Sequence, residues 1–263
     1  MTDVELVRLT IAVLGGLLGL AIGSFLNVVV HRVPLGLSVV APGSHCPNCQ
    51  SPVRNRHNVP VLGWLMLRGR CYDCRSPISA RYPLVEAGTG LVFVLVGLRF
   101  AETPAALPAY WAFAALGIAL SLIDLDVRRL PNALVVPAYP ILAALLVVAA
   151  APHAGFRALV GGLMLFGIFL IIALAAPGSM GFGDVKLAGV VGAMTAWLSW
   201  GTLLAGALLS FVFGAVVGVL LIASHRAGRR SAVPFGPFLV LGAWTAILGA
   251  GYLGDLYLTA VAA

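Results

Sequence analysis

Long apolar runs joined by short polar connections make up most of this chain. A helix needs about 20 apolar residues to cross a bilayer. Eight stretches fit a crossing helix, although the sixth is short and rich in glycine: 6–30, 83–100, 107–123, 133–151, 158–176, 185–200, 202–223 and 236–258. The hydrophobic pattern therefore predicts an all-α polytopic membrane protein with about eight transmembrane helices.

One polar segment is much longer than the others and lies between the first two predicted helices. It divides the chain into a first transmembrane helix (1–30), a polar domain (31–82) and a helical membrane bundle (83–263). Inside it, "VPVLGWLML" (59–67) is apolar but too short to span a bilayer. We expect an ordinary packing segment there, and the alternative is an interfacial patch beneath the cysteines.

The composition agrees with a membrane protein and excludes a soluble one. The chain has 263 residues, of which 61% are hydrophobic and 10% are charged, and its mean hydropathy is +1.04. Soluble domains carry about 25% charged residues. The N-terminal flank "MTDVELVR" is acidic and the first apolar run is long, so we expect this run to stay as a helix and not act as a signal peptide.

The position of the basic residues predicts the orientation, because Lys and Arg collect in cytoplasmic loops. With both termini outside, only Arg8, Arg99 and Arg157 fall on the outer side. The net charge of +7 then reflects topology and contact with anionic membrane lipid, and no nucleic-acid partner is expected. The cytoplasmic basic residues are Arg32, Arg54, Arg56, Arg68, Arg70, Arg75, Arg81, Arg128, Arg129, Lys186, Arg226, Arg229 and Arg230.

All four cysteines lie in the polar domain, as two C-x-x-C pairs. Cys46 and Cys49 precede Cys71 and Cys74, and 21 residues separate the pairs. Such pairs can hold one tetrahedral Zn²⁺ through four thiolates, which leaves no open position for catalysis. The predicted cytoplasmic location disfavours disulfides, the alternative for these thiols. We therefore predict structural zinc in a small cytoplasmic domain.

Acidic residues are rare here, and a few lie beside predicted spans, where charges are costly and usually functional. Asp124 follows the third span, Asp184 precedes the sixth, and both ends face the cytoplasm in the predicted topology. Two close carboxyl groups share a proton, so one can activate water while the other protonates a carbonyl or leaving amine. This pattern favours metal-free aspartic peptidase chemistry. The alternative is that these acids merely balance nearby bases.

Residues around the two acids refine this hypothesis. Asp126 competes with Asp124 for the role of first catalytic acid. Side chains two positions apart on a helix point about 200° from each other, so only one of the two can easily face Asp184, and Asp126 can pair with Arg129 instead. Gly181 and Gly183 in "GFGDVK" (181–186) leave room for a substrate backbone. The neighbouring Lys186 has two open roles, namely lowering the pKa of the Asp184 carboxyl or binding lipid phosphate.

Four segments together resemble the type IV prepilin peptidases of the GxGD aspartic class, in the same order and over nearly the whole chain. "GSFLNVVVHRVP" (23–34) resembles the N-terminal signature of that family. The cysteine-rich stretch (46–86) resembles its zinc domain. "LIDLDVRRLPN" (122–132) and "GFGDVKLAG" (181–189) resemble the segments that carry its two catalytic aspartates.

The resemblance implies that Asp124 and Asp184 are the catalytic pair and that Cys46, Cys49, Cys71 and Cys74 bind zinc. It also implies a bacterial cytoplasmic-membrane enzyme of type IV pilus or type II secretion systems. Such an enzyme cuts the basic leader from prepilins and pseudopilins, then methylates the new N-terminus with S-adenosylmethionine. One departure is Asn132, where the family often has Asp, and this position lies outside the pair.

The site for the methyl donor is less defined than the peptidase site. Asn27, Arg32 and Glu86 are candidates near the zinc domain, although a structural role is the expected one for each. The "GSFLN" segment has the same two interpretations, donor binding or helix packing. A different class of function, a non-enzymatic scaffold or transporter with a zinc-ribbon domain, stays as the alternative. The clustering of acids at one membrane face favours the enzyme.

Overall fold

The computed structural model describes residues 2–149, 151–176, 178, 180–224 and 233–262. Within these ranges the chain is almost entirely helical, which confirms the all-α prediction. Arg226, Arg229 and Arg230, which the charge pattern assigns to the cytoplasmic side, lie outside the described residues.

A helix occupies each of the eight predicted spans. Six helical stretches in the described ranges are long and apolar enough to cross a membrane, whereas α5 and α7 have 17 residues each, so the count of eight crossings stays a prediction. The membrane helices are α1 (Asp3–Arg32), α3 (Arg81–Arg99), α4 (Leu107–Val127), α5 (Asn132–Val148), α6 (Pro152–Ala175), α7 (Phe182–Leu198), α8 (Trp200–Ala223), α9 (Gly236–Thr245) and α10 (Gly251–Ala262).

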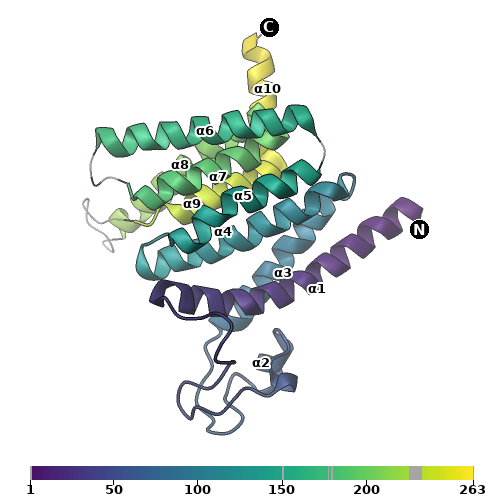
Figure 1. The fold of residues 1–263 in the computed structure, drawn as a ribbon, viewed down its shortest axis with the longest axis vertical. Coiled ribbons are helices and arrows are strands. Elements are labelled where there is room, and N and C mark those ends of the chain that lie inside the picture. Colours follow the sequence, from purple (N-terminus) through teal and green to yellow (C-terminus); the bar gives the residue numbers. More distant parts are fainter. Residues whose placement is uncertain (1, 150, 177, 179, 225–232, 263) are drawn as a thin grey trace. The chain divides into compact units, whose positions relative to one another are not determined.

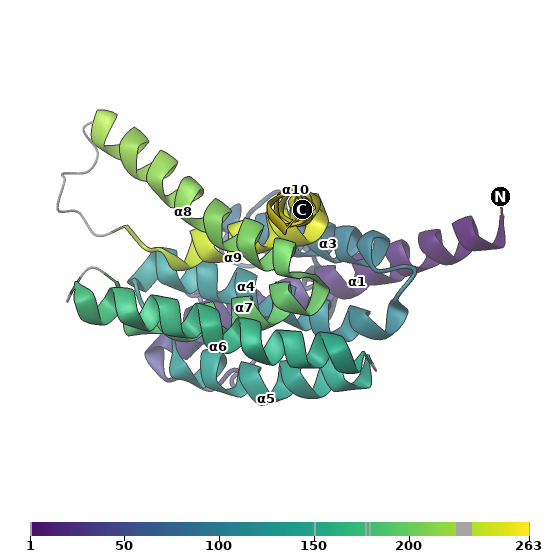
Figure 2. The ribbon, with the colours of Figure 1, turned by 90° about the horizontal axis from the view of Figure 1, so that it is seen from above.

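The last predicted span contains a break that the hydrophobic pattern does not indicate. A π-helical turn, Ala246–Ala250, separates α9 from α10 and contains one non-helical residue, Gly249. Figure 1 shows α10 leaving the direction of α4 to α9, and Figure 2 shows it end-on. Asp255 holds α10 to α8, because its carboxylate accepts hydrogen bonds from Ser199 Oγ (2.8 Å) and the Gly201 amide (3.1 Å).

The chain forms two compact units, residues 1–107 and 108–263. In the first unit, α1 and α3 lie side by side (Figure 1) and meet through glycines. A Cβ added at Gly19 would lie 2.7 Å from Phe93 Cβ, and one at Gly23 would lie 2.7 Å from Glu86 Cα. Small residues allow membrane helices to approach this closely. Gly23 of "GSFLN" therefore has the packing role.

The polar domain of the first unit contains the short helix α2 (Leu62–Met66). Trp64 packs inward and its Nε1 donates to the Ile78 carbonyl at 3.0 Å. Leu62 and Met66 are 57% and 66% exposed, so the expectation of an ordinary packing segment is wrong for these two side chains.

In the second unit, helices α4 to α9 lie side by side around α7 (Figure 1), and most α7 side chains are buried. The Tyr110 hydroxyl donates to the Met194 carbonyl of α7 at 2.8 Å. At the other end of α7, the Arg157 guanidinium donates to the carbonyls of Ala196, Trp197 and Leu198. These carbonyls have no partner within the helix, so Arg157 caps α7.

Candidate active site and metal centre

Asp124 lies in the last turn of α4 and is buried. Its Oδ2 accepts a hydrogen bond of 3.1 Å from the backbone amide of Gly236, the first residue of α9. Amide groups at a helix N-terminus have no intrahelical partner, and the helix dipole there favours a negative charge. The start of α9 therefore orients the Asp124 carboxyl group and stabilises its ionised form.

Asp184 is the third residue of α7 and is also buried. The two aspartates are close enough for the charge of Asp124 to act on the Asp184 carboxyl group. Asp184 Oδ1 makes no hydrogen bond with any residue that the structure describes. Buried polar atoms without a partner are uncommon and point to a functional role. The structure thus brings together the two acids that the sequence pairs, and leaves one Asp184 oxygen without a partner among the described residues.

Close backbone approaches surround this pair and require glycine. A Cβ at Gly236 would lie 2.8 Å from Asp124 Oδ2, and one at Gly183 would lie 2.8 Å from Leu130 Cβ. Gly183 was expected to leave room for a substrate backbone, and Leu130 is the neighbour that lies in this space. Neither Gly236 nor Leu130 belongs to the residues that the sequence singles out. The Gly-Pro pair at 236–237 is a helix-start signal that could have indicated the first.

The remaining polar residues of these segments lie apart from the pair. Asp126 is exposed. Lys186 donates from Nζ to Asn132 Oδ1 at 2.9 Å, and its ammonium group lies 5.1 Å from the centre of the Phe182 ring. Lys186 follows Asp184 by two residues and so points to a different side of α7. Asn132, the departure from the family pattern, is thus the partner of Lys186.

The four cysteines of the first unit form a cluster that fits zinc. Their Sγ atoms all lie within 4.8 Å of one another, with Cys46–Cys74 at 3.7 Å and Cys49–Cys71 at 3.9 Å. Tetrahedral Zn²⁺ with bonds of about 2.3 Å requires sulfur atoms about 3.8 Å apart. These two sulfur–sulfur distances therefore fit a single tetrahedral zinc site.

The surroundings of Cys46 and Cys74 favour the thiolate form, which is the form that binds metal, whereas burial and hydrogen bonds with Cys46 and Cys74 raise the pKa of Cys71. The Ser76 hydroxyl and backbone amide, together with the Asn48 side chain, lower the pKa of Cys74 to about 5. Hydrogen bonds from the Cys49 amide and the Ser76 hydroxyl lower the pKa of Cys46. The same backbone turn recurs in both pairs, because Gln50 and Arg75 have φ values of 58° and 60°.

The three candidates for the methyl donor contact backbone groups of the first unit. Asn27 Nδ2 donates to the Tyr82 carbonyl at 3.2 Å, and Arg32 donates to the carbonyls of Ser38 and Pro42. Glu86 is buried, and its Oε2 accepts from the Val61 amide at 2.7 Å. These contacts connect the polar domain to α1 and α3, so they favour the structural interpretation of each residue.

Comparison with known proteins finds relatives for both compact units of the chain. Residues 17–100 match the bacterial peptidase A24 N-terminal domain, and residues 111–219 match the type IV leader peptidase family. Proteins named prepilin leader peptidase/N-methyltransferase from Aeromonas hydrophila and Pseudomonas putida are 36% and 39% identical to this chain. The alignments cover 92% of both chains in the first case and 89% of both in the second. No solved structure matches the chain. Identity of this extent over nearly the full length shows that the chain belongs to the type IV leader peptidase family.

Proposed function

We propose that this chain removes the leader peptide from prepilins and pseudopilins and then methylates the new N-terminus. Family membership supports both activities, since the relatives are named for both. The observation that carries the peptidase is the burial of Asp124 and Asp184 together, with Asp184 Oδ1 free of hydrogen bonds to described residues.

The two carboxyl groups supply general acid and general base catalysis. One aspartate, ionised, takes a proton from a water molecule, whose oxygen attacks the scissile carbonyl carbon. The other aspartate, protonated, donates its proton to the carbonyl oxygen. Collapse of the tetrahedral intermediate breaks the C–N bond: the amine leaves with a proton from the first carboxyl group, and one hydroxyl of the intermediate returns its proton to the second. The Gly236 amide favours Asp124 as the ionised partner, since it donates to Oδ2.

The charge pattern supports the place of cleavage. A prepilin has a basic leader in the cytoplasm and an apolar helix in the bilayer, so its scissile bond lies at the cytoplasmic membrane edge. We assign both termini of the enzyme to the outer side, which brings the Asp124 end of α4 and the Asp184 end of α7 to that edge. The protein belongs by this reasoning in the bacterial cytoplasmic membrane.

Methylation transfers a methyl group from the sulfonium of S-adenosylmethionine to the new amine, which loses a proton. Asn27, Arg32 and Glu86 are the polar residues proposed near this step, although all three bind backbone groups. Zinc would be held by the four cysteines and would fold the polar domain without taking part in the chemistry, because four thiolates complete its coordination.

A cleavage assay in membranes tests the peptidase assignment. Prepilin is incubated with the wild type and with Asp124→Asn, Asp184→Asn and Asp126→Asn, and mass spectrometry identifies the product N-terminus. We expect no cleavage with the first two variants and wild-type cleavage with the third. A methyl group on the wild-type product demonstrates the second activity.

The alternative is a non-enzymatic scaffold or transporter, and the same assay separates it from the enzyme. Wild-type cleavage by both the Asp124→Asn and the Asp184→Asn variants would refute the aspartic pair. Absence of cleavage by correctly inserted wild-type protein would leave the scaffold or transporter as the better explanation.

A further inference from the structure

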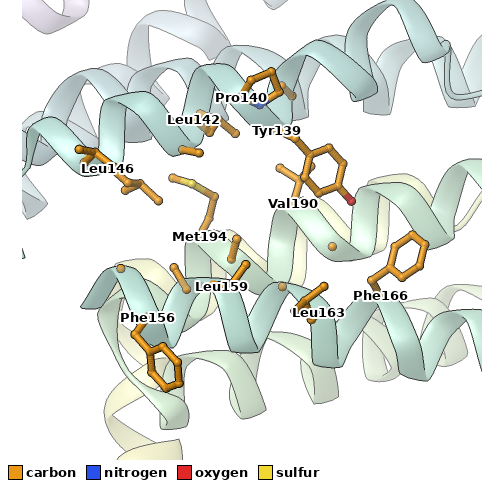
Figure 3. A pocket seen from close by; sticks show the side chains of 18 of the residues that line it. Tyr139, Pro140, Leu142, Leu146, Phe156, Leu159, Leu163, Phe166, Val190 and Met194 are labelled. Carbon is orange, nitrogen blue, oxygen red and sulfur yellow. The ribbon is translucent and has the colours of Figure 1, made fainter. Parts of the chain in front are cut away.

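The second unit contains an apolar groove that the peptidase mechanism does not use. Its walls are α5 and α6 and its floor is α7, and its volume is about 970 Å³. Figure 3 shows Leu142 and Leu146 of α5 on one side and Leu159 and Leu163 of α6 on the other. Tyr139 and Phe166 lie toward one end, and Leu146 and Phe156 toward the opposite end.

The groove is apolar along its length and has a charge at one end. Among its described lining residues, Lys186 is the only charged one. The Lys186 ammonium group donates to Asn132, the first residue of α5, and an ammonium group has two further donors. The connection that leads into α5 adds the exposed cations Arg128 and Arg129. An occupant that matches this pattern has a long apolar part and an anionic end.

The length of the groove indicates its occupant. Its α5 wall runs from Val136 to Val147, about 16 Å at 1.5 Å per residue. This length is close to half of the ~30 Å thickness of a hydrocarbon core, so it matches one leaflet and the acyl chains of one lipid.

The rim of the groove is apolar and exposed. Val147, Leu159 and Leu163 line it and are 77%, 60% and 64% exposed. In a membrane these side chains contact lipid, so an acyl chain enters from the side without unfolding the bundle. We propose that this groove binds an anionic phospholipid, with its acyl chains between α5 and α6 and its phosphate on Lys186.

Two neighbouring alanines of α5 offer a matched test. Ala143 is exposed and lines the groove, whereas Ala144 is exposed and does not. Native mass spectrometry of the full chain in detergent measures the binding of phosphatidylglycerol and of phosphatidylcholine with the same acyl chains. We expect Ala143→Trp to abolish both lipid adducts and Ala144→Trp to keep them.

Substitutions of Lys186 test the role of the charge at the end of the groove. Lys186→Met should weaken phosphatidylglycerol binding about fivefold, as expected for one membrane-surface charge, and leave phosphatidylcholine unchanged. Lys186→Arg should restore the preference for the anionic lipid. Equal binding of the two lipids by the wild type would overturn the anionic assignment.

Other outcomes identify other occupants and overturn the proposal. Lipid binding by Ala143→Trp at the wild-type level would exclude a lipid in the groove. If that variant keeps its lipid but has a raised KM for prepilin, the groove holds the substrate helix. If it instead loses a dimer that the wild type forms, the groove holds a second copy. Lipid binding is measured without catalysis, so the result does not depend on the peptidase assignment.

Discussion

The contact between Gly236 and Asp124 predicts that one added methyl group stops cleavage. In Gly236→Ala, the new Cβ would lie 2.8 Å from Asp124 Oδ2 and 3.5 Å from Leu130 Cδ2. Real Cβ atoms do not approach an oxygen so closely, so either the Asp124 side chain or the start of α9 must move. Both movements break the hydrogen bond of 3.1 Å from the Gly236 amide.

The expected loss follows from the strength of that hydrogen bond. A hydrogen bond to a charged group contributes about 1.5–3 kcal/mol. If that energy is lost in the transition state, kcat/KM for prepilin falls roughly 10- to 150-fold, since each 1.4 kcal/mol is a factor of ten. The assay is the initial rate of leader removal in detergent or membranes, with thermal unfolding measured on the same preparations.

A second glycine substitution is the control for this experiment. An added Cβ at Gly167 of α6 meets no atom within 4 Å, so Gly167→Ala should keep the wild-type rate. The reasoning would be refuted if Gly236→Ala cleaved prepilin as fast as Gly167→Ala. The comparison requires that both variants unfold at a similar temperature. If Gly236→Ala alone lost thermal stability, its slower cleavage would be explained by unfolding.

Three further predictions concern the parts that hold the site. Arg157→Ala removes the cap of α7 and should lower the free energy of unfolding by about 2–4 kcal/mol, measured by thermal melting, with Arg157→Lys intermediate; an unchanged melting temperature would contradict the capping role. Purified protein should contain about one zinc per chain by elemental analysis, and replacement of the four cysteines by serine should remove it; zinc retained in that variant would place the metal elsewhere. Glu86→Ala should increase hydrogen exchange at the Val61 amide, whereas Glu86→Gln, which keeps an acceptor oxygen, should not. Loss of methylation in Glu86→Gln with unchanged exchange would instead support a role in binding the methyl donor.

The helices could be predicted because a bilayer leaves the backbone few choices. A segment without water must satisfy its own hydrogen bonds, so each long apolar run becomes a helix. The break at 246–250 was not predictable, since α9 and α10 form one apolar run, and the contacts of Asp255 in α10 join residues 56 and 54 positions apart. Two exceptions to the charge pattern also have structural reasons. Arg8 forms an ion pair with Glu102, and Arg157 caps α7.

The site could be predicted only as far as single residues carry chemistry. Asp124, Asp184 and the cysteines stand out because charged residues and thiols are few in this chain. Gly236 does not stand out, because its role comes from a hydrogen bond to a residue 112 positions earlier. Leu130 is hidden for the same reason: only the folded chain brings it against Gly183.

Helix α7 explains why an acid and a base occur two residues apart in "GFGDVK". Side chains two residues apart on a helix point about 200° from each other, so Asp184 and Lys186 face different surroundings. Asp184 is buried beside Asp124, whereas Lys186 lines the groove and binds Asn132. The two charges therefore do not neutralise each other. Of the two roles open for Lys186, the structure favours lipid phosphate, because the contacts of its ammonium group are with Asn132 and Phe182 rather than the Asp184 carboxyl group.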